Sequence, residues 1–172
     1  MCSVPYHSRG SLTRKLPDEA ATIALGSALA PLLTPGMVVW LDGDLGAGKT
    51  ALVRALLRAR GHAGPVKSPT YAVVEVYVVS RIYLYHFDFY RFGDPGEFLD
   101  AGLDEYFRDD AVCLVEWPGK AAGFVPPADL SIRLRFLADA SCRGRRVELL
   151  ACSERGRACL NALTDPAFRD DA

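Results

Sequence analysis

The segment from Gly43 to Thr50 has the residue types and spacing of a loop that binds phosphate groups. Gly43 is followed, after four residues, by Gly48, Lys49 and Thr50. A loop that wraps a triphosphate must turn its backbone N–H groups inward, which requires glycine where φ is positive or where a Cβ would meet a phosphate. Lys49 is expected to bridge the β- and γ-phosphates as a point charge, and Thr50 to supply a hydroxyl ligand for Mg²⁺.

The residues on either side of this loop supply the strand and the helix that such a loop requires. Residues 37–41 are an apolar run typical of a buried strand, and residues 51–57 have helical apolar spacing. The start of that helix adds unpaired N–H groups and the positive end of its dipole. A chance glycine turn is the alternative explanation, and the correct flanks make it the weaker one.

Two other apolar runs end in a carboxylate, as expected for the metal side of such a site. Asp88 follows the run 82–87, and Glu116 follows the run 111–115. An acidic residue at a strand end near a phosphate loop binds Mg²⁺ directly or through water, whereas a carboxylate facing solvent is the alternative for either one. Because both are predicted at the same end of one sheet, we expect a shared site, for which Asp88 and Glu116 compete.

A third segment, Ser68-Pro69-Thr70, is rich in hydroxyl groups and follows the helix of the phosphate loop. Switch-like loops of P-loop proteins meet the γ-phosphate and Mg²⁺ at this place in the chain. The spacing is equally compatible with an ordinary turn that leads into the next strand. His86, two residues before Asp88, is compatible both with a catalytic role and with a packed histidine at a strand end.

The order of the strands and helices expected around these residues predicts an α/β fold of the P-loop NTPase type. This fold is a three-layer sandwich with a mainly parallel sheet. The runs 72–79 and 82–87 are separated by two residues, which predicts an antiparallel hairpin insertion. Residues 1–172 are expected to form a single domain, with a loose lead-in over 1–12 and a tail over 164–172. The other expected elements are helices at 17–32, 49–60, 97–107 (interrupted at Gly102) and 154–163, and strands at 111–117, 130–136 and 146–152.

The composition limits the class of protein. With 50% hydrophobic residues, 24% charged residues and a net charge of −1, the chain has no general electrostatic footprint for nucleic acid, so we expect no DNA partner. Arg143, Arg145 and Arg146 form a local basic group, for which a solvated hairpin turn is favoured over an RNA or protein contact.

The five cysteines include no C-x-x-C pair, and no apolar run could span a membrane, so we expect a cytoplasmic protein with no membrane partner.

Two missing residue types narrow the choice of nucleotide. Asn161 is the one asparagine and precedes alanine, so the Asn-Lys-x-Asp motif that reads guanine is absent. The chain also contains no glutamine that could orient an attacking water as in Ras-like enzymes. ATP is therefore the expected nucleotide.

Four segments taken together closely resemble the TsaE (YjeE) family. They are the phosphate loop, Ser68-Pro69-Thr70-Tyr71, His86-Phe87-Asp88-x-Tyr90-Arg91 and Glu116-Trp117-Pro118. The resemblance implies a small Mg²⁺-dependent ATPase that acts with the TsaB–TsaD complex to form threonylcarbamoyladenosine in tRNA. It also implies that hydrolysis is weak without those partners and that tRNA contact is indirect, through the complex.

The resemblance also assigns roles to residues at matching positions. Lys49, Thr70, Asp88 and Glu116 are the expected catalytic residues, Thr50, Glu116 and Asp88 are the expected metal-side residues, and Tyr90 and Arg91 either support Asp88 or meet the partner. The residues expected to bind the nucleotide are Asp44, Leu45, Gly46, Ala47, Gly48, Lys49, Thr50, Ala51 and Trp117.

Two alternatives to this function remain open on the sequence. A P-loop small-molecule kinase would share the fold and size, but it should carry an arginine-bearing lid and an acceptor pocket, which residues 94–123 do not convincingly provide. A nucleotide-gated assembly module, with little turnover of its own, would carry the same motifs.

Overall fold

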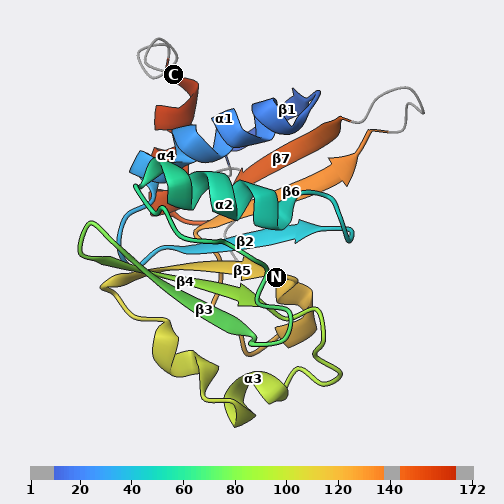
Figure 1. Cartoon of the computed structure of the whole chain (residues 1–172), viewed down its shortest axis with the longest axis vertical. Coiled ribbons are helices and arrows are strands. Elements are labelled where there is room, and N and C mark those ends of the chain that lie inside the picture. Colours follow the sequence, from blue (N-terminus) through green and yellow to red (C-terminus); the bar gives the residue numbers. More distant parts are fainter. Residues whose placement is uncertain (1–9, 138–143, 166–172) are drawn as a thin grey trace.

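The computed structural model of the chain describes residues 10–137 and 144–165, and its centre is a mixed sheet of seven strands (Figure 1). The strand order is β1-β7-β6-β2-β5-β4-β3. The four inner strands β6, β2, β5 and β4 run parallel, and β1, β7 and β3 pair antiparallel at the two sides. The strands are β1 (Ser11–Leu16), β2 (Val38–Gly43), β3 (Val74–Val79), β4 (Ile82–Asp88), β5 (Ala111–Glu116), β6 (Leu130–Phe136) and β7 (Arg145–Ala151).

Helical segments cover both faces of this sheet. Alternate side chains of β5 enter two separate cores, since Leu114 packs with α1, α2 and α4 whereas Val115 packs with the aromatic segment that follows β4. Figure 1 shows α1 and α2 side by side in front of the sheet, with α3 at the bottom. This is the predicted three-layer α/β arrangement. The helices are α1 (Glu19–Leu29), α2 (Lys49–Ala59), α3 (Glu97–Asp100) and α4 (Glu154–Thr164), with short 3-10 segments η2 (Ala30–Leu32), η3 (Leu103–Tyr106) and η4 (Pro118–Ala121).

The helix α1 is fixed at its start by a side-chain cap and in its middle by close packing. Asp18 precedes the helix, and its Oδ1 accepts a hydrogen bond from the N–H of Ala21 at 2.8 Å. Gly26 faces α2 so closely that a Cβ there would lie 2.6 Å from the Cβ of Ala55. Because α2 begins at Lys49, this contact ties α1 to the helix that follows the phosphate loop.

The predicted hairpin is confirmed, and its turn is formed without glycine. β3 and β4 pair antiparallel from Val74 opposite Phe87 to Val79 opposite Ile82. Ser80 and Arg81 both have positive φ, 51° and 66°, as a two-residue turn of type I′ requires. The backbone strain that glycine would avoid is therefore borne by two ordinary residues.

Two expectations for the ends of the chain differ from the structure. Residues 11 and 12, expected in a loose lead-in, begin the edge strand β1, which was not predicted; residues 1–9 lie outside the described part of the chain. Residue 164, expected in the tail, is the last residue of α4, and 166–172 lie outside the described residues. By contrast, the predicted interruption of 97–107 at Gly102 is confirmed, because Gly102, with φ of 64°, separates α3 from η3.

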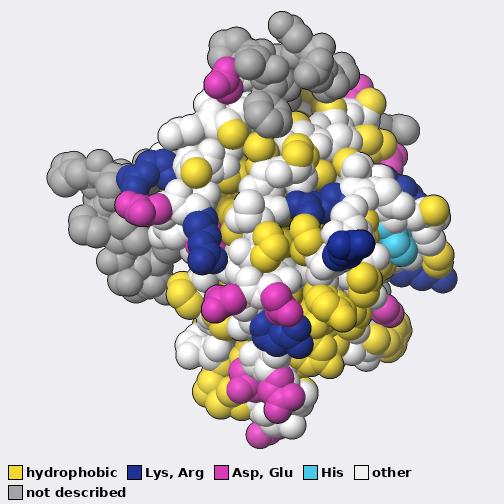
Figure 2. Space-filling view, turned by 90° about the vertical axis from the view of Figure 1, so that its left-hand side faces the viewer, with side chains coloured by type: hydrophobic (Ala, Val, Ile, Leu, Met, Phe, Trp, Pro, Cys, Tyr) yellow, Lys and Arg dark blue, Asp and Glu magenta, His cyan; other side chains and the backbone are white. Residues whose placement is uncertain are grey.

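The surface mixes charges of both signs, as the net charge of −1 requires. Figure 2 shows dark blue and magenta side chains interspersed with apolar ones, and a gathering of magenta at the bottom, the level at which α3 lies in Figure 1. None of the helices in the described ranges is long and apolar enough to cross a membrane. The exposed acidic residues of the α3 region are Asp94, Glu97, Asp100, Asp104, Glu105, Asp109 and Asp110.

Candidate nucleotide site

The glycine loop lies where β2 ends and α2 begins, at the carboxyl edge of the parallel strands. Gly43 has φ of 143°, and a Cβ there would lie 2.3 Å from the carbonyl oxygen of Leu134 on β6. Gly48, with φ of 107°, forms the N-cap of α2. The two glycines allow the chain to turn tightly enough for the first N–H groups of α2 to face the loop, which is the geometry of an anion site.

Lys49 is almost fully buried inside the loop. Its Nζ donates to the carbonyl oxygens of Gly43 at 2.6 Å and Asp44 at 2.9 Å, and it lies 4.1 Å from the centroid of the Trp117 ring. Desolvation by burial lowers the pKa of Lys49 below its ordinary value of 10.5, although nearby carboxylates, led by Glu116, act in the opposite direction. The ammonium group is thus held at the centre of the loop, with carbonyl oxygens as its partners.

Thr50, in the first turn of α2, meets Glu116 at the end of β5. The hydroxyl of Thr50 donates to Oε1 of Glu116 at 2.8 Å, and Nε2 of His86 lies 2.9 Å from the same oxygen. Glu116 and His86 are both buried. A threonine hydroxyl and a carboxylate are hard oxygen ligands of the kind that Mg²⁺ prefers, so these residues fit that ion.

Asp88 lies directly opposite Glu116 in the parallel pair of β4 and β5, but it has different partners. Its Oδ2 accepts hydrogen bonds from Ser68 and, at 2.8 Å, from Thr70, while its Oδ1 accepts from the N–H of Tyr90 at 3.0 Å. Both oxygens of this buried carboxylate are therefore engaged by the chain itself. Asp88 fixes the loop that carries Thr70.

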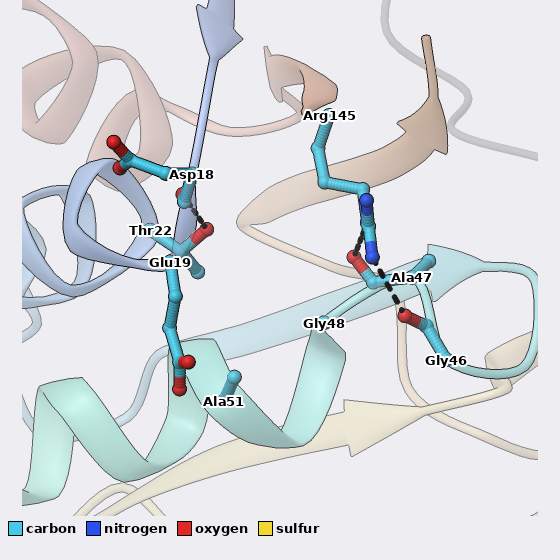
Figure 3. A pocket seen from close by; sticks show the side chains of 8 residues that line it. All are labelled: Asp18, Glu19, Thr22, Gly46, Ala47, Gly48, Ala51 and Arg145. Carbon is cyan, nitrogen blue, oxygen red and sulfur yellow. Dashed lines mark hydrogen bonds between the residues drawn. The ribbon is translucent and has the colours of Figure 1, made fainter. Parts of the chain in front are cut away.

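A pocket of about 450 Å³ opens beside the phosphate loop, between α1 and the start of β7 (Figure 3). Its walls carry acidic side chains from the start of α1 and the basic side chain of Arg145 on the other side. The residues that line it are Asp18, Glu19, Thr22, Gly46, Ala47, Gly48, Ala51 and Arg145.

The expectation that the local basic group is a solvated turn is wrong for Arg145, which contacts the phosphate loop. Its Nε donates to the carbonyl oxygen of Ala47 at 3.1 Å and its Nη2 to that of Gly46 at 3.3 Å (Figure 3). Its guanidinium lies over the ring of Phe136. Arg146 is exposed as expected, and residue 143 lies outside the described residues. This contact between Arg145 and the loop could not be predicted from the arginine-rich segment alone.

The remaining predicted residues surround the same site. Leu45 is exposed at the tip of the loop, and the ring of Trp117 packs 5.1 Å from that of Tyr90. Arg91 stacks over the exposed ring of Tyr71 and does not contact Asp88. Of this neighbouring pair, Tyr90 donates to Asp88 through its backbone N–H, whereas the exposed Arg91 stacks on Tyr71.

A parallel sheet, a glycine loop between its strand and helix, and a carboxylate at the end of the adjacent strand define an α/β protein of the P-loop type. Residues 16–146 match the sequence profile described as threonylcarbamoyl adenosine biosynthesis protein TsaE. The chain therefore belongs to the TsaE family, a nucleotide-binding family of tRNA threonylcarbamoyladenosine biosynthesis.

Individual relatives agree with this family. The chain is 40% identical over 160 residues to the tRNA threonylcarbamoyladenosine biosynthesis protein TsaE of Haemophilus influenzae, a match that covers 90% of this chain and 99% of the relative. It is 37% identical over 147 residues to the protein of the same name from Bacillus subtilis, with 82% and 90% covered. The crystal structure of Bacillus subtilis YdiB is similar, with a TM-score of 0.78, 29% identity and 92% and 97% of the two chains covered.

Proposed function

We propose that this chain is a Mg²⁺-dependent ATPase that acts with the TsaB–TsaD complex in the formation of threonylcarbamoyladenosine in tRNA. The observation that carries the proposal is the convergence of Lys49, Thr50 and Glu116 at the start of α2. These residues supply a cation for phosphates and two oxygen ligands for a metal. Family membership supports the pathway, and the arrangement of the loop supports the nucleotide.

The loop and its neighbouring pocket support a position for the nucleotide. The phosphates would lie against the N–H groups of residues 44–51, and the pocket bordered by Ala51 and Glu19 gives room for the adenosine. The missing guanine-reading motif supports ATP over GTP.

The chain's own residues would act mainly by positioning and by charge neutralisation. Lys49 would exchange its carbonyl partners for phosphate oxygens, and Thr50 with Glu116 would hold Mg²⁺. When bound, Mg²⁺ neutralises charge that develops on the phosphate oxygens. Thr70 would face the γ-phosphate from its loop, and Asp88, which already fixes that loop, would lie near the attacking water.

The partners are expected to complete this site. Asp88 accepts a hydrogen bond from Thr70, and Lys49 donates to the carbonyl oxygen of Gly43 within the phosphate loop. Exposed apolar groups border the site at Leu45 and Tyr71, where the TsaB–TsaD complex would meet it. Contact with tRNA would be indirect, through that complex.

The decisive experiment measures release of inorganic phosphate from ATP by the chain alone and with TsaB, TsaD and tRNA. We expect weak hydrolysis alone and a large rise on mixing, both abolished by Glu116→Ala, while this variant still binds TsaB–TsaD. Accumulation of a phosphorylated small molecule in place of phosphate would identify a kinase. Intact tRNA modification by Glu116→Ala, with hydrolysis lost, would instead identify a nucleotide-gated assembly module.

A further inference from the structure

His86 is a fully buried polar side chain at the edge of the candidate site. Its ring has no exposure to solvent, and its Nε2 lies 2.9 Å from Oε1 of Glu116 on the neighbouring strand. An ionised carboxylate only accepts hydrogen bonds, so Nε2–H of the imidazole is the donor. This contact joins the ends of β4 and β5, which run parallel side by side.

The imidazole is not explained by packing alone. Its Nδ1 is buried and has no hydrogen-bond partner among the described residues. Leaving such an atom without a partner costs free energy, which an apolar side chain in the same place would avoid. The neighbouring positions on this face, Leu84 and Leu114, are indeed apolar. Burying the polar ring therefore costs folding free energy, and the hydrogen bond to Glu116 offsets this cost.

That contact determines which oxygen of Glu116 is available to bind a metal ion. Oε1 accepts from both His86 and Thr50, whereas Oε2 accepts no hydrogen bond from any residue in the ranges 10–137 and 144–165. Two donors that approach Oε1 from different elements, α2 and β4, restrict rotation of the carboxylate. Oε2 is therefore the oxygen of Glu116 that would bind the metal ion.

We propose that His86 is a positioning residue, which fixes the carboxylate of Glu116 so that Mg²⁺ binds together with the nucleotide. The inference rests on the proposed function, since it concerns the Mg²⁺ side of that same site. His86 acts here as a hydrogen-bond donor and does not touch the substrate. Partners of this kind, which orient a metal ligand, typically contribute about 10- to 100-fold to metal affinity or activity.

Three substitutions separate the donor from the bulk of the ring. In His86→Gln, the side-chain amide N–H lies at a similar distance from the backbone as Nε2 and can still donate to Glu116. In His86→Asn, the amide is too short to reach, and His86→Leu removes the polar group altogether. Asparagine is thus the matched control for polarity, and leucine for volume.

The measurement is the affinity for ADP by calorimetry, with Mg²⁺ and with EDTA, together with the rate of phosphate release. We expect all variants to bind ADP in EDTA within about twofold of the wild type, because the phosphate loop is intact. Mg²⁺ should strengthen ADP binding equally in the wild type and His86→Gln. In His86→Leu and His86→Asn most of that strengthening should be lost, and the rate of phosphate release at saturating ATP and Mg²⁺ should fall about tenfold.

The outcomes are separable from those of the proposed function. If the wild type neither binds ADP nor releases phosphate, the proposed function fails. If the wild type does both and His86→Leu keeps the full effect of Mg²⁺, only the positioning role fails. A His86→Gln variant that binds ADP normally in EDTA but is as defective with Mg²⁺ as His86→Asn would also overturn it. Should His86→Leu not fold, the Gln and Asn variants decide the question alone.

Discussion

The ammonium group of Lys49 lies 4.1 Å from the centroid of the Trp117 indole ring, while it donates to the carbonyl oxygens of Gly43 and Asp44. The ring face and the two carbonyls are together the partners that a phosphate must replace. Trp117 takes its position from an unusual backbone conformation, with φ of 58°, immediately after β5. The indole therefore lies beside the ammonium group that is expected to bind phosphate.

Nucleotide binding should change the fluorescence of Trp117. ATP or ADP is expected to draw Lys49 away from the indole, and loss of this cation alters the emission of the ring. The chain has one other tryptophan, Trp40, whose Nε1 donates to the carbonyl oxygen of Pro126 at 3.2 Å. Titration with ADP should therefore change the signal in the wild type and in Trp40→Phe, but not in Trp117→Phe. A wild-type signal that stays constant at saturation contradicts the placement.

Removal of the Lys49 ammonium should weaken nucleotide binding strongly. Hydrogen bonds to charged groups contribute about 1.5–3 kcal/mol each, so Lys49→Ala is expected to lose about 10- to 100-fold in ADP affinity by calorimetry. The pH dependence has a defined sign. Because burial lowers the pKa of Lys49 below 10.5, its proton is lost at lower pH than in an ordinary lysine.

The affinity of the wild type should consequently fall as the pH rises through the alkaline range below 10.5, since only the ammonium form attracts phosphate. Lys49→Arg serves as the control, because an arginine stays charged throughout this range. Equal ADP affinity in Lys49→Ala and the wild type would remove the phosphate-loop assignment itself.

Local patterns could be predicted from the sequence, and contacts between distant segments could not. Glycine spacing fixes the loop 43–50, and parallel strands that end at one edge bring Asp88 next to Glu116. The strand β1 was missed because its polar side chains carry a weak pattern, and its pairing with β7 forms it. Arg145 lies 98 residues beyond Ala47, so no local pattern indicates their hydrogen bond.

The hydroxyls of Ser68 and Thr70 should have different effects on turnover, although both donate to Asp88. Thr70 is the one proposed to face the γ-phosphate, so Thr70→Val should lower kcat about 10- to 100-fold, while Ser68→Ala keeps the Thr70 contact and lowers it less. ADP affinity should be unchanged in both, because ADP has no γ-phosphate. Thr70→Ser restores the hydroxyl as a control. Equal losses of turnover in Thr70→Val and Ser68→Ala would show that the hydroxyls act only through Asp88.

Arg145 should stabilise the phosphate loop in its binding conformation. Its donors satisfy the carbonyl oxygens of Gly46 and Ala47 on the outside of the loop, leaving the N–H groups to face inward. With about 1 kcal/mol for each of the two hydrogen bonds, Arg145→Met is expected to weaken ADP binding by up to about 30-fold and to speed hydrogen exchange of the loop amides. Arg146→Met, an exposed neighbour, is the matched control and should change neither. Identical behaviour of the two variants would exclude this role.

The close contact of α1 with α2 should make Gly26→Ala destabilising. Alanine favours a helix over glycine by about 1 kcal/mol, so propensity alone predicts a gain in stability. The added Cβ, however, would lie 2.6 Å from the Cβ of Ala55 and 3.0 Å from the carbonyl oxygen of Leu52. Overpacking of this kind typically costs about 1–3 kcal/mol, so we expect a lower free energy of unfolding in urea.

Two further variants test this explanation of the Gly26 contact. Ala55→Gly combined with Gly26→Ala removes the facing methyl group, and the double variant should recover part of the stability that Gly26→Ala loses. Ser27→Ala, on the neighbouring and partly exposed position, should leave the free energy of unfolding nearly unchanged. A Gly26→Ala variant more stable than the wild type would show that α1 shifts away from α2 at little cost, and that helix propensity outweighs the packing of the two helices.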